Sequence, residues 1–163
     1  MQPGNAVLIS QEALKQAKAA ARGYEEARRE YHKQRQLILN SSGGSLPGEG
    51  HSGNRWSGTR ATETKAERLE SLERAYWVRE MHAVERARDR IGAGMPGEMR
   101  EALKKAIMIN ISSGKKYPFE RLYVVGVSRR TFYRHRAAFL EDIAAEISVF
   151  SKKRLPFAGG KDI

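Results

Sequence analysis

The sequence predicts an all-α protein, and three observations lead to this prediction. Apolar residues recur at intervals of three and four over long segments, which is the spacing of amphipathic helices. No segment reads convincingly as a strand, and no internal repeat is present. Glycine and proline are concentrated in the segments between the periodic ones, where helices end and restart. We therefore expect helices joined by turns and one longer linker.

The first expected element is a long N-terminal helix over residues 10–39, which together with the residues before it forms the segment 1–39. It begins with strong helix formers, and Ala17, Tyr24 and Tyr31 recur every seven residues. This apolar stripe is thin for a helix that stands alone. We expect the helix to dock on the rest of the protein, and a dimerising coiled coil is the alternative.

Residues 40–60 interrupt the helical pattern. This Gly/Ser-rich stretch contains too little apolar surface to offset the entropy lost on ordering, so it predicts a flexible linker. Trp56 lies within it between Arg55 and Arg60. An aromatic ring flanked by arginines could contact a nucleic acid or a protein partner, or could simply pin the loop to the core.

Residues 61–150 are expected to form a helical domain. Strong periodicity predicts a helix over 62–91, in which Thr64 and Glu67 have the spacing of a capping box. Gly92 and Gly94 would end that helix.

Further helices are expected after this point. Pro96 suits the start of a helix that continues to Ser112. A short helix is expected over 119–125 and a final one from Ser128 to about Val149. Residues 151–163 read as a disordered basic tail.

The charge points toward a polyanionic partner. The chain has 30 Lys and Arg against 19 Asp and Glu, a net charge of +11, and such a surplus favours nucleic acid or an anionic membrane surface. A membrane is the weaker reading, because no apolar run approaches the roughly 20 residues of a membrane span and no helix combines a strong apolar face with a uniformly basic one. The N-terminus has no signal-peptide pattern, so we expect a cytoplasmic protein without a membrane partner.

The excess of positive charge is densest over residues 115–136, where seven basic side chains accompany Glu120 alone. This segment also carries the pattern of a helix-turn-helix, expected at 118–149. Gly126 would supply a positive φ at the turn. Val125 and Val127 would fill the space between the two helices, and Ser128 would cap the second helix.

The second helix of this motif divides into two faces. Phe132, Phe139 and Ile143 would face the core, with His135 beside them as a partly buried packing residue. The opposite face lies where such helices read base edges in the major groove of double-stranded DNA. Its expected base-reading residues are Arg129, Arg130, Tyr133 and Arg134. The expected phosphate-holding residues are Lys115, Lys116, Arg121 and Arg136, and Ser128 and Thr131 are candidates for phosphate or thymine-methyl contacts together with Tyr133.

The sequence offers no catalytic constellation. Its acids over 63–101 alternate with Arg and Lys at the spacing of solvated helix pairs. The four histidines are scattered without metal-ligand spacing, and the absence of cysteine excludes disulfides and thiolate metal sites. We expect neither an enzyme nor a cofactor nor a metal.

The stretch from Gly126 to Arg136, continued by Phe139 to Ala144, resembles the helix-turn-helix of sigma-factor region four. The likeness is closest to the ArpU/RinA-like phage regulators. This resemblance implies a sequence-specific transcription regulator that activates phage late genes together with host RNA polymerase, as a monomer or a homodimer. A second hypothesis is a DNA-packaging adaptor of the small-terminase type, which would oligomerise through the helices over 10–39 or 62–111.

Overall fold

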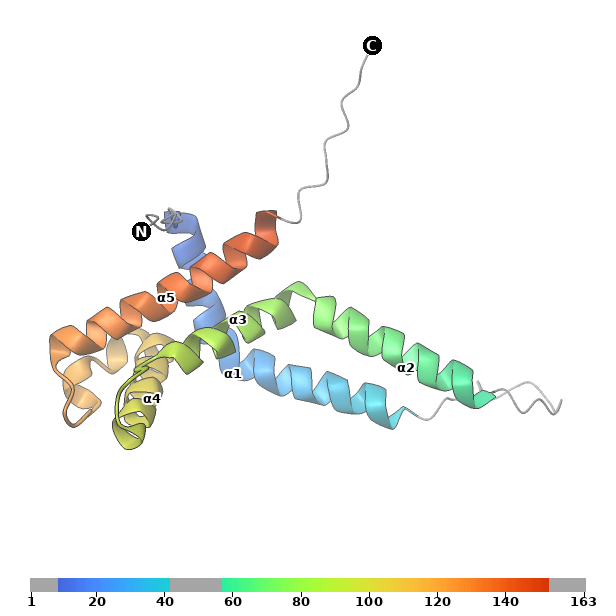
Figure 1. The fold of residues 1–163 in the computed structure, drawn as a ribbon, viewed down its shortest axis with the longest axis horizontal. Coiled ribbons are helices and arrows are strands. Elements are labelled where there is room, and N and C mark those ends of the chain that lie inside the picture. Colours follow the sequence, from blue (N-terminus) through green and yellow to red (C-terminus); the bar gives the residue numbers. More distant parts are fainter. Residues whose placement is uncertain (1–8, 42–56, 153–163) are drawn as a thin grey trace, which may run out of the picture. The chain divides into compact units, whose positions relative to one another are not determined.

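The computed structural model describes residues 9–41 and 57–152, apart from the side chains of residues 57–62, 115 and 150–152. All regular secondary structure within these ranges is helical, which confirms the predicted all-α class (Figure 1). The chain divides into two units. The described parts of Met1–Tyr24 and Glu80–Ile163 form the first, the core unit; those of Glu25–Arg79 form the second, the hairpin unit.

Helix α1 spans Gln11–Asn40 and agrees closely with the helix predicted over 10–39. Its buried side chains lie within the core unit and are mostly small: Ala13, Ala17, Ala21 and Tyr24. The hydroxyl of Tyr24 lies 3.2 Å from a carboxylate oxygen of Glu85. Alanines one turn apart allow close approach of a neighbouring helix, so the expectation that this helix docks is confirmed for its first half.

The core unit contains α1 up to Tyr24, α3 (Tyr76–Arg90) from Glu80 onward, α4 (Gly97–Ser113) and α5 (Arg129–Lys152) (Figure 1). Each helix contributes apolar side chains to one core. The largest fully buried ones are Tyr24, Leu103, Ile107, Ile111, Phe132, Phe139, Ile143, Ile147 and Val84. Helix α3 ends just before Gly92 and Gly94, as predicted, and both glycines have positive φ.

The segment between α4 and α5 differs from the prediction. A helix was expected over 119–125, but only the 3-10 turns Gly114–Lys116 and Phe119–Arg121 form there. The second turn ends because Tyr123 adopts a left-handed conformation with φ 47°, which stops a helix in the way a C-terminal glycine does. The expected short first helix of the helix-turn-helix is therefore wrong.

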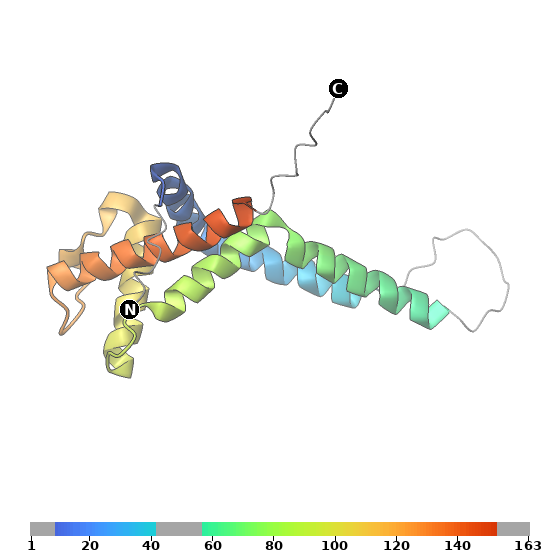
Figure 2. The same ribbon diagram turned by 45° about the horizontal axis from the view of Figure 1, so that its top comes forward.

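The hairpin unit pairs the second half of α1 with α2 (Ser57–Arg74), which runs antiparallel to it (Figure 2). Lys65 Nζ donates to the carbonyl of Leu39 at 3.1 Å, and the Tyr31 hydroxyl donates to the Glu73 carboxylate. The residue numbers of both pairs add up to 104, so a single antiparallel register holds along the hairpin.

Two predicted boundaries are wrong here. Helix α2 begins at Ser57, inside the segment 40–60 expected as a linker. Thr64 consequently lies within the helix, where it cannot form a capping box at its start. The rest of that linker and the basic tail from residue 153 lie outside the described residues, together with Arg55, Trp56 and the side chain of Arg60.

The helix predicted over 62–91 is broken at Ala75. The Ala75 N–H donates to the carbonyl of Leu72, a 3-10-type bond at the junction of α2 and α3. Leu72 and Met81 are both buried, although residues nine apart would lie about 180° from each other on a straight helix. The buried face of the apolar pattern therefore changes between Leu72 and Met81, and the helix is broken where this change occurs.

Candidate nucleic-acid interface

The start of α5 is fixed by Ser128. Its Oγ accepts a hydrogen bond from the Thr131 backbone N–H at 3.1 Å, and its carbonyl accepts from the Phe132 N–H at 2.9 Å. The hydroxyls of Ser128 and Thr131 lie 2.9 Å apart. These contacts satisfy N–H groups that a helix start leaves free, so the predicted cap is confirmed.

The turn before α5 depends on Gly126, which has the predicted positive φ at +77°. Val127 is buried as expected, and Val124 is buried as well. Val125 is 86% exposed, so the prediction that it fills the space behind the turn is wrong. The reason is the absence of the helix over 119–125, which changes the direction of each side chain after Tyr123.

The two predicted faces of α5 are present. Phe132, Phe139 and Ile143 are buried, and the ring of Phe132 packs against that of Phe119 with centroids 5.2 Å apart. The opposite face is exposed over the first two turns of the helix. It carries Arg129, Arg130, Arg134 and Ala137.

Within this exposed set, Arg129 has neighbours on two sides. Its guanidinium lies 3.1 Å from the carboxylate of Glu120 and 5.9 Å from the ring centroid of the half-buried Tyr133. Both charged side chains remain more than half exposed, so the pair is screened and contributes little to stability. Glu120 orients Arg129 and at the same time neutralises part of its charge.

The expected phosphate-holding residues do not form one row. Lys116 and Arg121 are exposed, and Arg121 Nη1 donates to the carbonyl of Lys116 at 3.3 Å, which links the two 3-10 turns. The side chain of Lys115 lies outside the described residues. Arg136 is half-buried, and its Nε is buried without a hydrogen-bond partner among the described residues. It lies on the flank of α5 that faces α1 and α4, away from the exposed arginines.

His135 packs beside the core face, as expected of it. Burial and the charge of neighbouring Arg134 lower the pKa of its imidazole below the ordinary value. Its Nε2 is buried without a hydrogen-bond partner among the described residues. Its surroundings therefore favour the neutral ring.

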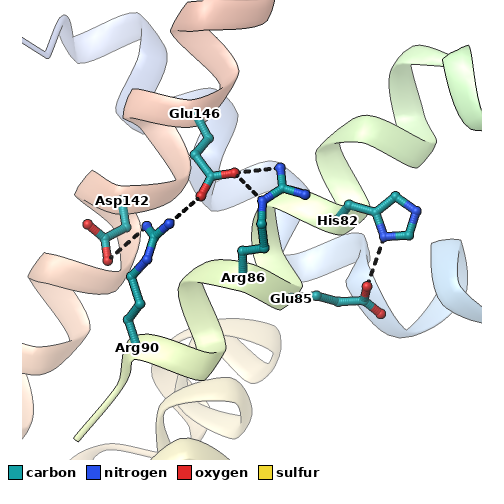
Figure 3. A network of polar contacts seen from close by, with 6 residues as sticks. All are labelled: His82, Glu85, Arg86, Arg90, Asp142 and Glu146. Atoms are coloured by element: carbon teal, nitrogen blue, oxygen red, sulfur yellow. Dashed lines mark hydrogen bonds and ion pairs between the residues drawn. The ribbon is translucent and has the colours of Figure 1, made fainter. Parts of the chain in front are cut away.

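Helix α5 is held in place at its other end by ion pairs with α3 (Figure 3). The carboxylate of Glu146 lies 2.6 Å from the guanidinium of Arg86 and 3.0 Å from that of Arg90. The guanidinium of Arg90 also lies 3.6 Å from the carboxylate of Asp142. The Glu146 side chain is only 18% exposed. The acidic side chains in the second half of α5 thus pair with α3, while one basic face of its first half is exposed.

Four side chains near the exposed arginine face of α5 were not predicted from the sequence. Tyr123 and Val125 are 87% and 86% exposed in the turn before α5; only the left-handed Tyr123 explains their exposure, and no sequence signal predicts it. Lys18 and Arg22, on α1, line a pocket together with Tyr133 and Arg136 of α5. Their i,i+4 spacing was visible in the sequence, but the docking of α1 beside α5 was not.

Other kinds of site find no support in the described ranges. No group of three or more His, Cys, Asp or Glu side chains is arranged there to hold a metal ion. Over the same residues, none of the helices is both long and apolar enough to cross a membrane. No family model matches the sequence, and neither a curated protein nor a solved structure matches it.

Proposed function

We propose that this chain is a DNA-binding transcription regulator that contacts duplex DNA through the first two turns of α5. The observation that carries the proposal is the exposed set Arg129, Arg130 and Arg134 on a helix whose start is fixed by Ser128. A helix of this kind enters the major groove with its N-terminal residues at the base edges. The role is one of binding, without a catalytic step.

The placement of charge on α5 supports a ligand. The N-terminus of a helix carries partial positive charge, so acidic side chains stabilise it and basic ones do not. The first turn of α5 contains Arg129 and Arg130 and no acidic residue. These arginines therefore reduce the stability of the helix that carries them, and an anion bound at this end would offset that cost.

Arg130 and Arg134 are the strongest candidates for base reading. They lie one turn apart on the exposed face, and each guanidinium can donate two hydrogen bonds to guanine. Arg129 would read a base only after leaving Glu120, and otherwise would hold a phosphate. Ser128 and Thr131 already share the cap, so we assign them to phosphate contact near the helix start, with Lys116 and Arg121 at the edge of the interface.

The partner and the biological setting follow from the sequence resemblance. We propose that the chain activates phage late genes with host RNA polymerase in the cytoplasm of a bacterial cell. The hairpin unit is the candidate surface for polymerase or for a second copy, since Leu37 and Leu39 on α1 are 62% and 43% exposed. The same exposed leucines also favour the second candidate, an oligomeric DNA-packaging adaptor.

The main test is selection of bound sequences from a random pool of duplexes, followed by affinity measurements on the selected site. Arg130→Ala with Arg134→Ala should weaken binding at least about 30-fold, because each guanine contact contributes about 1–3 kcal/mol. Helicity should not change, since alanine is the better helix former. Lys33→Ala with Arg35→Ala is the matched control: it removes the same charge from exposed positions on α1.

Unchanged binding by the Arg130/Arg134 double variant would refute the assignment of α5. A control variant that lost as much affinity would show that the effect is one of net charge alone. Light scattering separates the two candidate functions. A monomer or dimer supports the regulator, and an assembly of eight or more copies supports the packaging adaptor.

A further inference from the structure

A pocket of about 350 Å³ lies in the core unit, where α1, α4 and α5 meet. Three of its lining side chains are cationic: Lys18 and Arg22 from α1, and Arg136 from α5. The lining also includes Asn110 and Tyr133, and none of the described residues that form it is acidic. We propose that this pocket binds a phosphate group that is part of a larger ligand.

The three cations line one pocket without an acidic residue among its described lining, so an anion bound there would reduce their mutual repulsion. Lys18 and Arg22 are one turn apart on α1, a spacing at which like charges destabilise a helix. Arg136 adds a third charge, and its Nε is buried without a hydrogen-bond partner among the described residues. A buried donor left in this state costs free energy that a hydrogen-bonded anion would recover.

Arg22 is already oriented for a ligand. Its Nε donates to the carbonyl of Ile111 at 3.3 Å, near the C-terminal end of α4. That bond fixes the guanidinium plane and leaves its two terminal nitrogens to bind elsewhere. One of them, Nη2, lies 3.9 Å from the position that a Cβ on Gly114 would occupy, so the bare backbone of Gly114 forms the wall beside it.

Phosphate fits this lining better than a carboxylate does. A phosphate carries up to two negative charges and several acceptor oxygens, which matches two guanidinium groups and an ammonium group. The pocket volume falls at the small end of the range for ligand sites, about 300–1,000 Å³, and exceeds the needs of a bare ion. The group attached to the phosphate therefore has room beside Tyr133.

Two sources can supply such a phosphate: the backbone of duplex DNA, or a free nucleotide. Tyr133 connects the pocket to the proposed DNA face, because it lines the pocket and also lies 5.9 Å from the Arg129 guanidinium. Binding of a phosphate of duplex DNA rests on the proposed function, whereas binding of a free nucleotide does not. The chemistry of recognition is the same for both.

The test compares the full-length chain with Lys18→Met, which removes the charge and keeps the apolar stem of the side chain. Lys105→Met is the matched control, because Lys105 is exposed on α4 and outside the pocket. Lys18→Arg should restore binding. Titration with inorganic phosphate, against chloride at equal ionic strength, is followed through the amide resonances of Gly114 and its neighbours.

Phosphate should shift these resonances saturably, and Lys18→Met should weaken its binding at least about tenfold, as expected for one lost charged hydrogen bond. If the ligand is duplex DNA, Lys18→Met should also reduce the slope of log K against log salt by about 0.9. If it is a free nucleotide, duplex binding should be unchanged in Lys18→Met. In both cases Lys105→Met should behave like the unmodified chain.

The proposal is overturned if phosphate causes no saturable shift beyond chloride and Lys18→Met binds duplex DNA like the unmodified chain. Its failure is distinguishable from failure of the proposed function. A chain that binds duplex through Arg130 and Arg134, is unaffected by Lys18→Met and shows no saturable shift with phosphate retains the function and loses the pocket. A chain that binds phosphate at Gly114 but no duplex retains the pocket and loses the function.

Discussion

The substitution Gly126→Ala tests how the turn before α5 is built. Gly126 has φ +77°, and a Cβ there would lie 2.6 Å from Met99 Cε and 3.7 Å from its Sδ. The left-handed backbone costs an alanine about 1 kcal/mol. The overlap forces the end of the flexible Met99 side chain to move, which we expect to cost about 1 kcal/mol more. The free energy of unfolding should therefore fall by about 2 kcal/mol.

The two causes can be separated by urea unfolding of five variants, one of which is Met99→Ala alone. Repeating Gly126→Ala in a Met99→Ala background should cost only about 1 kcal/mol, because the overlapping atoms are gone. Gly94→Ala is the control for the backbone alone, since Gly94 has φ +88° and open space around its Cβ position. Gly97→Ala, in open space and without a positive φ, should not destabilise the chain.

Equal losses for Gly126→Ala in the two backgrounds would refute the contact with Met99. A loss for Gly126→Ala no greater than that for Gly94→Ala would do the same. The denaturant slope should stay constant throughout, so that changes in midpoint report changes in stability.

Three further predictions concern how α5 is held. Ser128→Ala removes the cap and should lower the free energy of unfolding by about 1 kcal/mol, measured by urea unfolding, whereas Ser128→Gly should cost only a few tenths; equal losses would contradict the side-chain cap. Glu146→Gln should cost about 1–2 kcal/mol, because it weakens two charged contacts at a mostly buried carboxylate, and Asp142→Asn, at a longer and more exposed pair, should cost less than about 0.5 kcal/mol. The lowered pKa of His135 means that the unfolded chain takes up this proton at higher pH than the folded one. The contribution of neutral His135 to the free energy of unfolding is thus fully present above pH about 6.5 and is lost as the pH falls through the pKa of the folded state. His135→Gln should make the free energy of unfolding depend less on pH in this range. An unaltered pH dependence would refute the role of His135.

Local patterns predicted the elements that depend on local chemistry. The start of α5 followed from the Gly126 turn and the Ser128 cap, and its buried face from the spacing of Phe132, Phe139 and Ile143. Such features need only neighbouring residues to form. They can therefore be read from the sequence.

The errors occurred where distant packing decides. Residues 119–125 have an apolar content that suits a helix, but Phe119 packs on Phe132 and both Val124 and Val127 are buried, an arrangement that a continuous helix would not give. The break at Ala75 depends on different burial before and after it. The cationic pocket depends on the docking of α1 beside α5, and an i,i+4 pair on one helix gives no sign of a third cation more than 100 residues away.

The charge pattern of α5 fits the DNA-binding function proposed for it. Its second half places Asp142 and Glu146 against arginines of α3, so those acids are neutralised within the core unit (Figure 3). Its first half carries Arg130 and Arg134 on the exposed face, at the helix end where positive charge is least favourable. Stability alone would favour the opposite order, with acids first and bases last. Because the ion pairs with α3 fix the helix from its acidic end, the basic end can keep an arrangement that costs stability in the free protein and that the proposed polyanionic partner would offset.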